Sequence, residues 1–182
     1  RKICLELIDA ALSSIQPQNI IEKNFSLTNN TLTIKDKTID LKNFERTFLL
    51  GFGKGSAGLS KNIEGLLGNL IIKGYVIDLV PEHFSKIEFT QGTHPLPSNE
   101  NINFTKNAIK QFSNPPAGEA GLTMTDLVIV VIAGGGSALF ENPYKIGLEK
   151  LIEVNKSLLF SGATITEMNV VRKHLSLVKG GG

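Results

Sequence analysis

Two clusters of glycine hold the clearest chemical signal in the sequence. The first reads GFGKGSAG from Gly51 to Gly58, and its central residues are Gly53, Lys54 and Gly55. Glycine lets the backbone turn sharply and lets an anion approach the backbone N–H groups. A helix that begins after the turn would direct its positive end at the same anion, and Lys54 adds a full positive charge. The pattern predicts an anion site, with a tight turn and a solvated lysine as the equally weighted alternative.

Known phosphate-binding motifs match this first cluster only in part. A P-loop requires G-x-x-x-x-G-K followed by Ser or Thr, but Gly55 follows Lys54, and Phe48 stands where the first glycine is needed. A dinucleotide-binding turn requires G-x-G-x-x-G, and Ser56 occupies its last position. Asp78 lies roughly 20 residues on, where such a turn has its acidic ribose ligand. The P-loop is therefore excluded, and the dinucleotide turn is a weak match.

The second cluster follows the apolar run DLVIVVIA and consists of Gly134, Gly135, Gly136 and Ser137. Consecutive glycines are costly to keep ordered, so they are best explained where the backbone must pack against a phosphate or a sugar. Ser137 would cap the next helix or donate its hydroxyl to the ligand. A plain hinge between a strand and a helix is the alternative interpretation.

A polar stripe is predicted on a helix near the end of the chain. In EMNVVRKHLSLVK, helical spacing places Asn169, Arg172, Lys173 and Ser176 on one face and apolar residues on the other. An arginine in such a stripe suits bidentate recognition of a carboxylate or a phosphate. A merely solvated helix face is equally compatible with the pattern.

His94 lies in the loop TQGTHPLPS, where Pro95 and Pro97 restrict the backbone and Gly92 allows it to bend. The loop would present the imidazole at the end of a strand, where it could bind an anion or transfer a proton. A histidine that only makes loop hydrogen bonds is the alternative.

The elements that position these residues follow a regular order. A buried strand, a glycine turn and a helix occur in succession twice, which predicts an α/β fold: a three-layer, Rossmann-like domain with a mainly parallel sheet flanked by helices. Residues 24–41 alternate in polarity and predict a small peripheral β hairpin or meander.

The expected strands cover residues 47–50, 70–79, 87–90 and 126–133, and the expected helices include 2–15, 98–112, 147–161 and 165–178. Pro17 would end the first helix, and Cys4 within it would lie in the core. Ligands bind beyond the carboxyl ends of parallel strands, where both glycine clusters fall.

Composition excludes several classes of protein. The 182 residues carry 19 Lys+Arg and 17 Asp+Glu, which is too balanced for a nucleic-acid binder held by charge. One cysteine and three scattered histidines do not provide a disulfide framework or a zinc site. No apolar run is long enough for a membrane span, and no signal peptide is visible. We expect a cytoplasmic protein, and the missing initiator Met and the ending VKGGG suggest that the natural chain extends at both ends.

These segments together resemble the N-terminal domain of the glycerate 2-kinase family. The similar segments are GFGKGSAGLS, GTHPLPSNEN, LVIVVIAGGGSALFENP and LLFSGATITEMNVVRKHLSLVKGG, and the resemblance covers residues 1–182. Ala133 departs from the serine that often precedes the glycines in this family. Members continue into a second, C-terminal domain, the MOFRL domain, which this chain lacks, and some carry the older label hydroxypyruvate reductase.

The resemblance implies ATP-dependent phosphorylation of D-glycerate to 2-phosphoglycerate with Mg²⁺. It matches Lys54 to the family's active-site lysine, and it implies phosphate binding by the glycine turns and binding of glycerate or nucleotide by Asn169, Arg172, Lys173 and His94. Metal ligands and a general base are not identified; Asp78 and Glu141 qualify on position alone. The chain would supply half of an active site, so on its own it is expected to bind without turnover, and a homodimer is compatible with it. An NAD(P)-dependent reductase and a non-catalytic nucleotide or sugar-phosphate binding domain are the alternatives.

Overall fold

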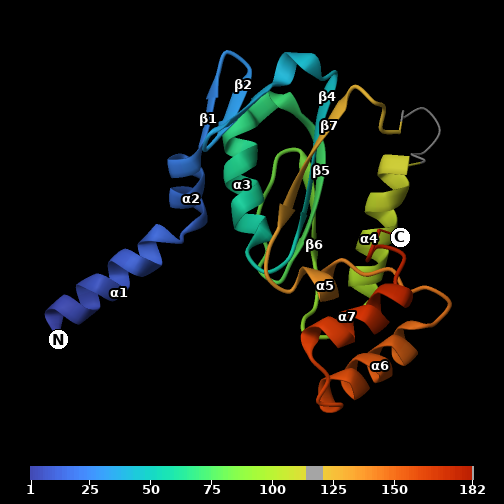
Figure 1. Ribbon diagram of the computed structural model, residues 1–182. Helices are drawn as coiled ribbons and strands as arrows, with labels where there is room; N and C mark the ends of the chain where they lie inside the picture. The colour runs from blue at the N-terminus through green and yellow to red at the C-terminus, as the bar shows by residue number, and fades with distance from the viewer. Residues whose placement is uncertain (114–120, 182) are drawn as a thin grey trace.

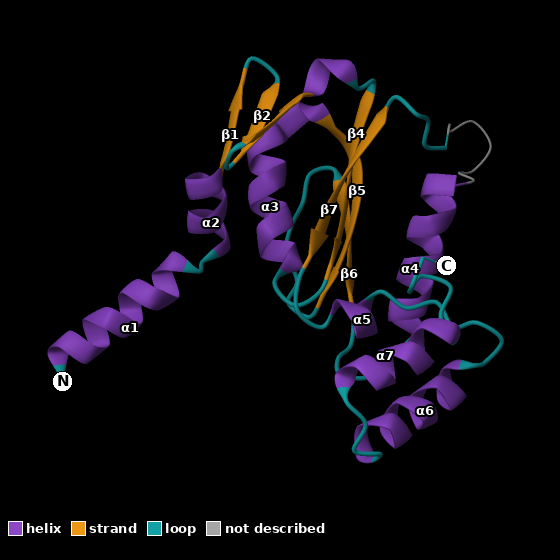
Figure 2. Ribbon diagram, in the orientation of Figure 1, coloured by secondary structure: helices purple, strands orange, loops and turns teal. Residues whose placement is uncertain are grey.

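A four-stranded parallel sheet between two layers of helices forms the body of the molecule (Figures 1 and 2). The computed structural model describes residues 1–113 and 121–181. The strands of this sheet are β4 (Arg46–Phe52), β5 (Ile71–Asp78), β6 (Ile87–Gln91) and β7 (Asp126–Ile132), in the order β6-β5-β4-β7. This arrangement confirms the predicted α/β fold.

Each face of the sheet has its own apolar core because side chains alternate along the strands. One face packs against α3 (Ser56–Leu67), with Leu49, Ile63 and Val76 among its buried residues. The other face packs against α4 (Asn99–Ser113), with a core of buried residues that comprises Tyr75, Ile77, Phe104, Ala108 and Leu139. The chain therefore passes to opposite faces of the sheet after β4 and after β7.

The N-terminal region forms the peripheral part of the fold. Strands β1 (Phe25–Thr28), β2 (Thr31–Ile34) and β3 (Lys37–Asp40) make a small antiparallel sheet, so of the two expected forms, a hairpin or a meander, the structure has the meander. Helix α1 (Lys2–Ser14) extends away from the body and buries no residue (Figure 1). The expectation that Cys4 lies in the core is wrong, since Cys4 is exposed.

Pro17 does end the first helical segment, but it also begins α2 (Pro17–Asn24). Proline is well tolerated at the first position of a helix because that N–H has no intrahelical partner. Two short 3-10 helices, η1 (Leu41–Asn43) and η2 (Gly68–Leu70), precede β4 and β5.

The C-terminal helices lie beyond the carboxyl ends of the strands (Figure 1). They are α5 (Gly136–Leu139), α6 (Leu148–Phe160) and α7 (Ile165–His174). Thr164 and Glu167 form a reciprocal capping box that fixes the start of α7. The expected helix over 165–178 is too long, because α7 ends at His174 and Ser176 is buried in the following segment. Ser176 therefore does not belong to the polar stripe.

Candidate functional site

The two glycine turns meet at the point where the chain leaves the sheet toward opposite faces. Strands β4 and β7 are parallel neighbours, so Phe52 and Ile132 end side by side. The N–H of Lys54 donates to the carbonyl of Gly134 at 2.6 Å. A Cβ added at Gly53 would lie 2.4 Å from the carbonyl oxygen of Ala133, and its φ is +113°. Only glycine fits there, and such a switch point is where open α/β sheets bind ligands.

The backbone amides of the first turn are already used within the chain. The N–H of Gly53 donates to Ile77, and the N–H groups of Gly55 and Ala57 donate to one oxygen of Asp78 at 2.8 and 2.9 Å. The side chain of Asp78 is buried and takes the place at the start of α3 that a phosphate would otherwise take. The expectation that the amides of Gly53 and Gly55 bind a nucleotide is therefore not met by this geometry. Their role is to shape the turn.

The amides of the second turn are different. Within the described ranges 1–113 and 121–181, the N–H groups of Gly135 and Ser137 donate to no carbonyl or side chain, whereas Gly136 donates to Ala133 and Gly134 pairs with Lys54 as an antiparallel bridge. Gly134 and Ser137 are exposed. Two N–H groups within three residues are thus available to an acceptor, which fits a phosphate or carboxylate.

Lys54 and His94 approach the second turn from two other segments. A Cβ added at Gly135 would lie 2.6 Å from Cδ2 and 2.8 Å from Nε2 of His94, and 3.2 Å from Cε of Lys54. Burial lowers the pKa of the His94 imidazole below its ordinary value, and the positive charge of Lys54 lowers it further. His94 is therefore neutral at neutral pH and can accept a proton or a hydrogen bond.

Two cavities flank the second turn and share Ser137 and Arg172 in their walls. The smaller measures about 190 Å³ and also contains His94, Glu141 and Asn155. The larger measures about 410 Å³ and is lined by Phe52, Gly136, Ser137, Phe140, Asn169, Arg172, Lys173, Val178, Lys179 and Gly180. The structure thus brings the predicted stripe residues to the larger cavity and His94 to the smaller one. Lys54 lies against Gly135 but lines neither.

Some residues that hold the site were not singled out from the sequence. Asn155 on α6 accepts a hydrogen bond from Nε of Arg172 at 3.0 Å, which orients the guanidinium between the cavities. Asn101 is fully buried on α4 and donates to the carbonyls of Thr93 and Ala138, joining the His94 loop to α5. The only signal for Asn101 in the sequence is a polar residue at helical spacing among the apolar positions of α4, which is difficult to distinguish from a solvated position.

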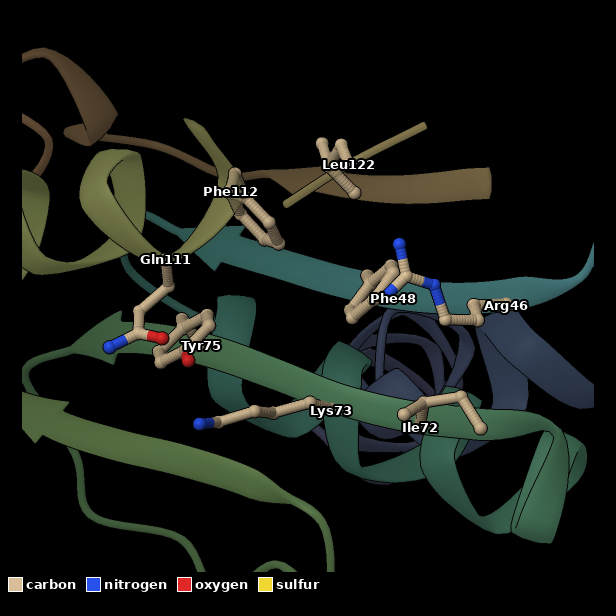
Figure 3. A pocket seen from close by; sticks show the side chains of 8 residues that line it. All are labelled: Arg46, Phe48, Ile72, Lys73, Tyr75, Gln111, Phe112 and Leu122. Atoms are coloured by element: carbon tan, nitrogen blue, oxygen red, sulfur yellow. The ribbon is translucent and has the colours of Figure 1, made fainter. Parts of the chain in front are cut away.

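A third cavity lies at the opposite end of the sheet and holds none of the predicted residues. It measures about 290 Å³ and lies between the end of α4 and the beginnings of β4 and β5. Figure 3 shows its aromatic walls and its two cations, Arg46 and Lys73. Both cations have carboxylate partners, Asp126 at 2.6 Å and Glu88 at 3.3 Å. We interpret this cavity as a packing gap.

Neither a metal-binding cluster nor a membrane-spanning helix is found in the described part of the chain. No group of three or more His, Cys, Asp or Glu side chains there could hold a metal ion. Among the same residues, no helix has the length and apolar character needed to cross a membrane.

The fold and the site define an α/β domain with two cavities beside the glycine turns, at the switch point of its sheet. A family profile described as "Domain of unknown function (DUF4147)" matches residues 3–182, and the chain belongs to this family. It matches the N-terminal part of glycerate 2-kinases, as the motifs predicted.

Named relatives and a solved structure agree that the chain corresponds to the N-terminal part of glycerate 2-kinases. The chain is 34% identical over 185 residues to a glycerate 2-kinase of Picrophilus torridus, covering 100% of this chain and 40% of the relative. It is 34% identical over 186 residues to an Agrobacterium vitis protein named as a hydroxypyruvate reductase, covering 100% of this chain and 37% of the relative. The crystal structure of a Thermotoga maritima glycerate kinase superposes with a TM-score of 0.78 at 29% identity, covering 99% of this chain and 39% of that one. The chain therefore spans about two fifths of the length of these relatives.

Proposed function

We propose that this chain forms the N-terminal half of a glycerate 2-kinase active site, with residues 1–182 as its N-terminal domain. The observation that carries the proposal is the meeting of Lys54 with the two available N–H groups of Gly135 and Ser137. Phosphoryl transfer needs mainly positioning and neutralisation of negative charge, and these groups supply both. The names of the relatives supply the acceptor, glycerate.

The reaction would transfer the γ-phosphoryl group of ATP to the 2-hydroxyl of glycerate. The hydroxyl oxygen forms a bond to the γ-phosphorus, the bond from phosphorus to the bridging oxygen of ADP breaks, and the hydroxyl proton is released. The amides of the second turn and Lys54 would stabilise the charge on the moving group. Arg172, oriented by Asn155, would hold a carboxylate or phosphate with its remaining N–H groups.

Mg²⁺ is implied by the resemblance, but the described residues do not fit a site for it. Mg²⁺ is usually held by one or two carboxylates together with the phosphates. The carboxylates near the turns have other partners: Asp78 binds the first turn and Glu141 binds Lys179. No step of the reaction is therefore assigned to a metal held by this chain.

An NAD(P)-dependent reductase is the second candidate, because one relative carries that name. The structure gives it less support. The acidic residue that would bind the ribose, Asp78, is 2% exposed and accepts hydrogen bonds from Gly55 and Ala57. A non-catalytic binding domain would share the phosphate-binding turn but would phosphorylate nothing.

The test compares ATP with NADH as the second substrate. It uses the complete chain, by which we mean the full-length protein that includes the C-terminal domain of its relatives. We expect ATP-dependent, glycerate-dependent release of ADP, and no oxidation of NADH by hydroxypyruvate.

Lys54→Ala should lower kcat by about 10²–10³ with the fold intact. Lys54→Arg should also be impaired, because a planar guanidinium does not replace a compact ammonium in a tight turn. Wild-type turnover by Lys54→Ala would remove the lysine from the mechanism.

A further inference from the structure

The larger cavity beside the second turn is lined by three cations, Arg172, Lys173 and Lys179. Among the described residues, no carboxylate lines it. The sequence motifs predicted the first two cations as ligands, but they gave no role to Lys179. A concentration of positive charge without lining carboxylates is typical of a site for an anion with several charges.

Lys179 is held at this cavity by a buried carboxylate. Its Nζ donates to Oε2 of Glu141 and, at 3.4 Å, to the hydroxyl of Ser176. The side chains of Lys179 and Glu141 are only 16% and 6% exposed. The N–H of Glu141 donates in turn to the hydroxyl of Thr105 inside α4 at 3.0 Å. This ammonium therefore cannot move freely as a surface lysine does.

The segment that carries Lys179 is itself fixed to the body. Leu177 donates its N–H to the carbonyl of Asn142 at 2.8 Å, and Pro143 and Ser176 pair as an antiparallel bridge. At the next position, Gly180 has φ +68°, and a Cβ there would lie 3.1 Å from Cβ of Lys173. This close approach places the segment that carries Lys179 against Lys173 on α7.

The charges around the cavity are not balanced within the chain. Burial lowers the pKa of Lys179, and the nearby charge of Arg172 lowers it further, whereas Glu141 opposes both effects. Glu141 is thus the one carboxylate that pairs with a cation of this cavity, which is lined by Arg172, Lys173 and Lys179. An anion in the cavity would stabilise the charged form of Lys179 and would use the N–H that Glu141 and Ser176 leave available.

We propose that Lys179 is a phosphate-binding residue, positioned by Glu141, and that the larger cavity takes the phosphate chain of a nucleoside triphosphate. The smaller cavity then takes the hydroxy acid, since it has less than half the volume. Ser137 and Arg172 line both cavities, so the transferred group would pass between them. The identity of the two ligands rests on the proposed function.

The test uses inorganic tripolyphosphate as the probe and the complete chain as the protein. Removing the lysine alone would leave Glu141 buried without its partner, so the variant changes both: Lys179→Met with Glu141→Gln. Lys156→Met, at an exposed position on neighbouring α6, is the control for loss of one positive charge. We expect the double variant to bind tripolyphosphate at least about tenfold more weakly by calorimetry, and the control to bind like the wild type.

A pH series separates positioning from a structural effect. Glu141→Gln alone removes the counter-charge and should lower the pKa of Lys179. Its affinity for tripolyphosphate should therefore fall more steeply than that of the wild type as the pH rises above neutrality. Parallel pH profiles for variant and wild type would contradict the positioning role of Glu141.

Steady-state kinetics separate this inference from the proposed function. We expect the double variant to raise KM for ATP by a larger factor than it changes KM for glycerate; the reverse pattern would overturn the assignment of the cavities. If the wild type phosphorylates glycerate but the double variant binds tripolyphosphate normally, the inference fails and the function stands. If the wild type binds tripolyphosphate through Lys179 but phosphorylates nothing, the function fails and the site stands. No binding of tripolyphosphate by the wild type would overturn the site.

Discussion

At the scale of single residues, Gly134 and Gly135 make a matched pair. Gly135 has φ +75° and lies against the His94 ring, whereas a Cβ at Gly134 would meet nothing nearer than Cε of Lys54 at 4.0 Å. Gly135→Ala should destabilise the fold by about 1–3 kcal/mol through backbone strain and should displace His94 and Lys54. Gly134→Ala should change stability by less than about 0.5 kcal/mol. Urea unfolding and tripolyphosphate binding measure both effects, and equal behaviour of the two variants would contradict this account.

The lowered pKa of His94 gives a second prediction at this scale. Burial is the larger cause and the charge of Lys54 the smaller. Lys54→Met should therefore raise the pKa of His94, yet leave it below the ordinary value. An NMR titration of the imidazole Cε1–H signal measures the change. His83, which is exposed on the loop before β6, serves as the control. No change at His94 would mean that the two side chains are not neighbours in solution.

The sequence predicted which residue types would gather here, but not which of their atoms are free. Both glycine clusters suggested backbone amides facing an anion. The difference between them depends on Asp78, whose Oδ2 accepts two N–H groups of the first turn, and long-range hydrogen bonds of this kind leave no local pattern. The pairing of Lys179 with Glu141 escaped prediction for the same reason, because 38 residues separate them.

At the scale of elements, the ion pair between Arg46 and Asp126 joins the beginnings of β4 and β7. The guanidinium lies 2.6 Å from Asp126, and its hydrogen bonds lower the pKa of that carboxyl from 3.8 to about 2. A carboxyl with a lowered folded-state pKa stabilises the fold above its unfolded-state value, and this contribution is lost as pH falls toward the folded-state value. The parallel contact between the two strands that carry the glycine turns should therefore weaken between about pH 4 and pH 2.

Asp126→Asn tests this effect. The variant should melt at a lower temperature than the wild type at neutral pH, and its melting temperature should fall less between about pH 4 and pH 2. Asp36→Asn, in the exposed turn between β2 and β3, is the control and should keep the acid dependence of the wild type. An Asp126→Asn curve parallel to the wild-type curve would show that the pair does not stabilise the fold.

Periodicity predicted the buried strands and most helices, because a strand covered on both faces reads as a continuous apolar run. It failed where tertiary contacts decide the outcome. The last helix ends at His174 because Ser176 pairs with Pro143, a contact that no helical pattern reveals. The apolar stripe of α1 indicated a buried face, yet Leu5, Leu7 and Leu12 are more than half exposed.

At the scale of the whole molecule, the order of the strands explains why turns 80 residues apart form one site. Neighbouring parallel strands end together, so the pairing of β4 with β7 brings Lys54 to Gly134. The sequence predicted parallel strands and the location of sites at their carboxyl ends. It could not predict the strand order, because several orders satisfy the same alternation of strands and helices.

The exposure of Lys54 leads to the last prediction. Charge stabilisation in catalysis is strong only where water is excluded, yet Lys54 is exposed in this chain, which spans about two fifths of its relatives. The 182-residue chain should therefore bind tripolyphosphate but release ADP from ATP and glycerate at least about 10²-fold more slowly than the complete chain. Calorimetry and a coupled ADP assay on the two proteins, at matched concentrations, measure binding and turnover separately. Equal turnover by the two proteins would mean that residues 1–182 exclude water from Lys54 without a second domain. The proposal that this chain supplies only half of the active site would then be wrong.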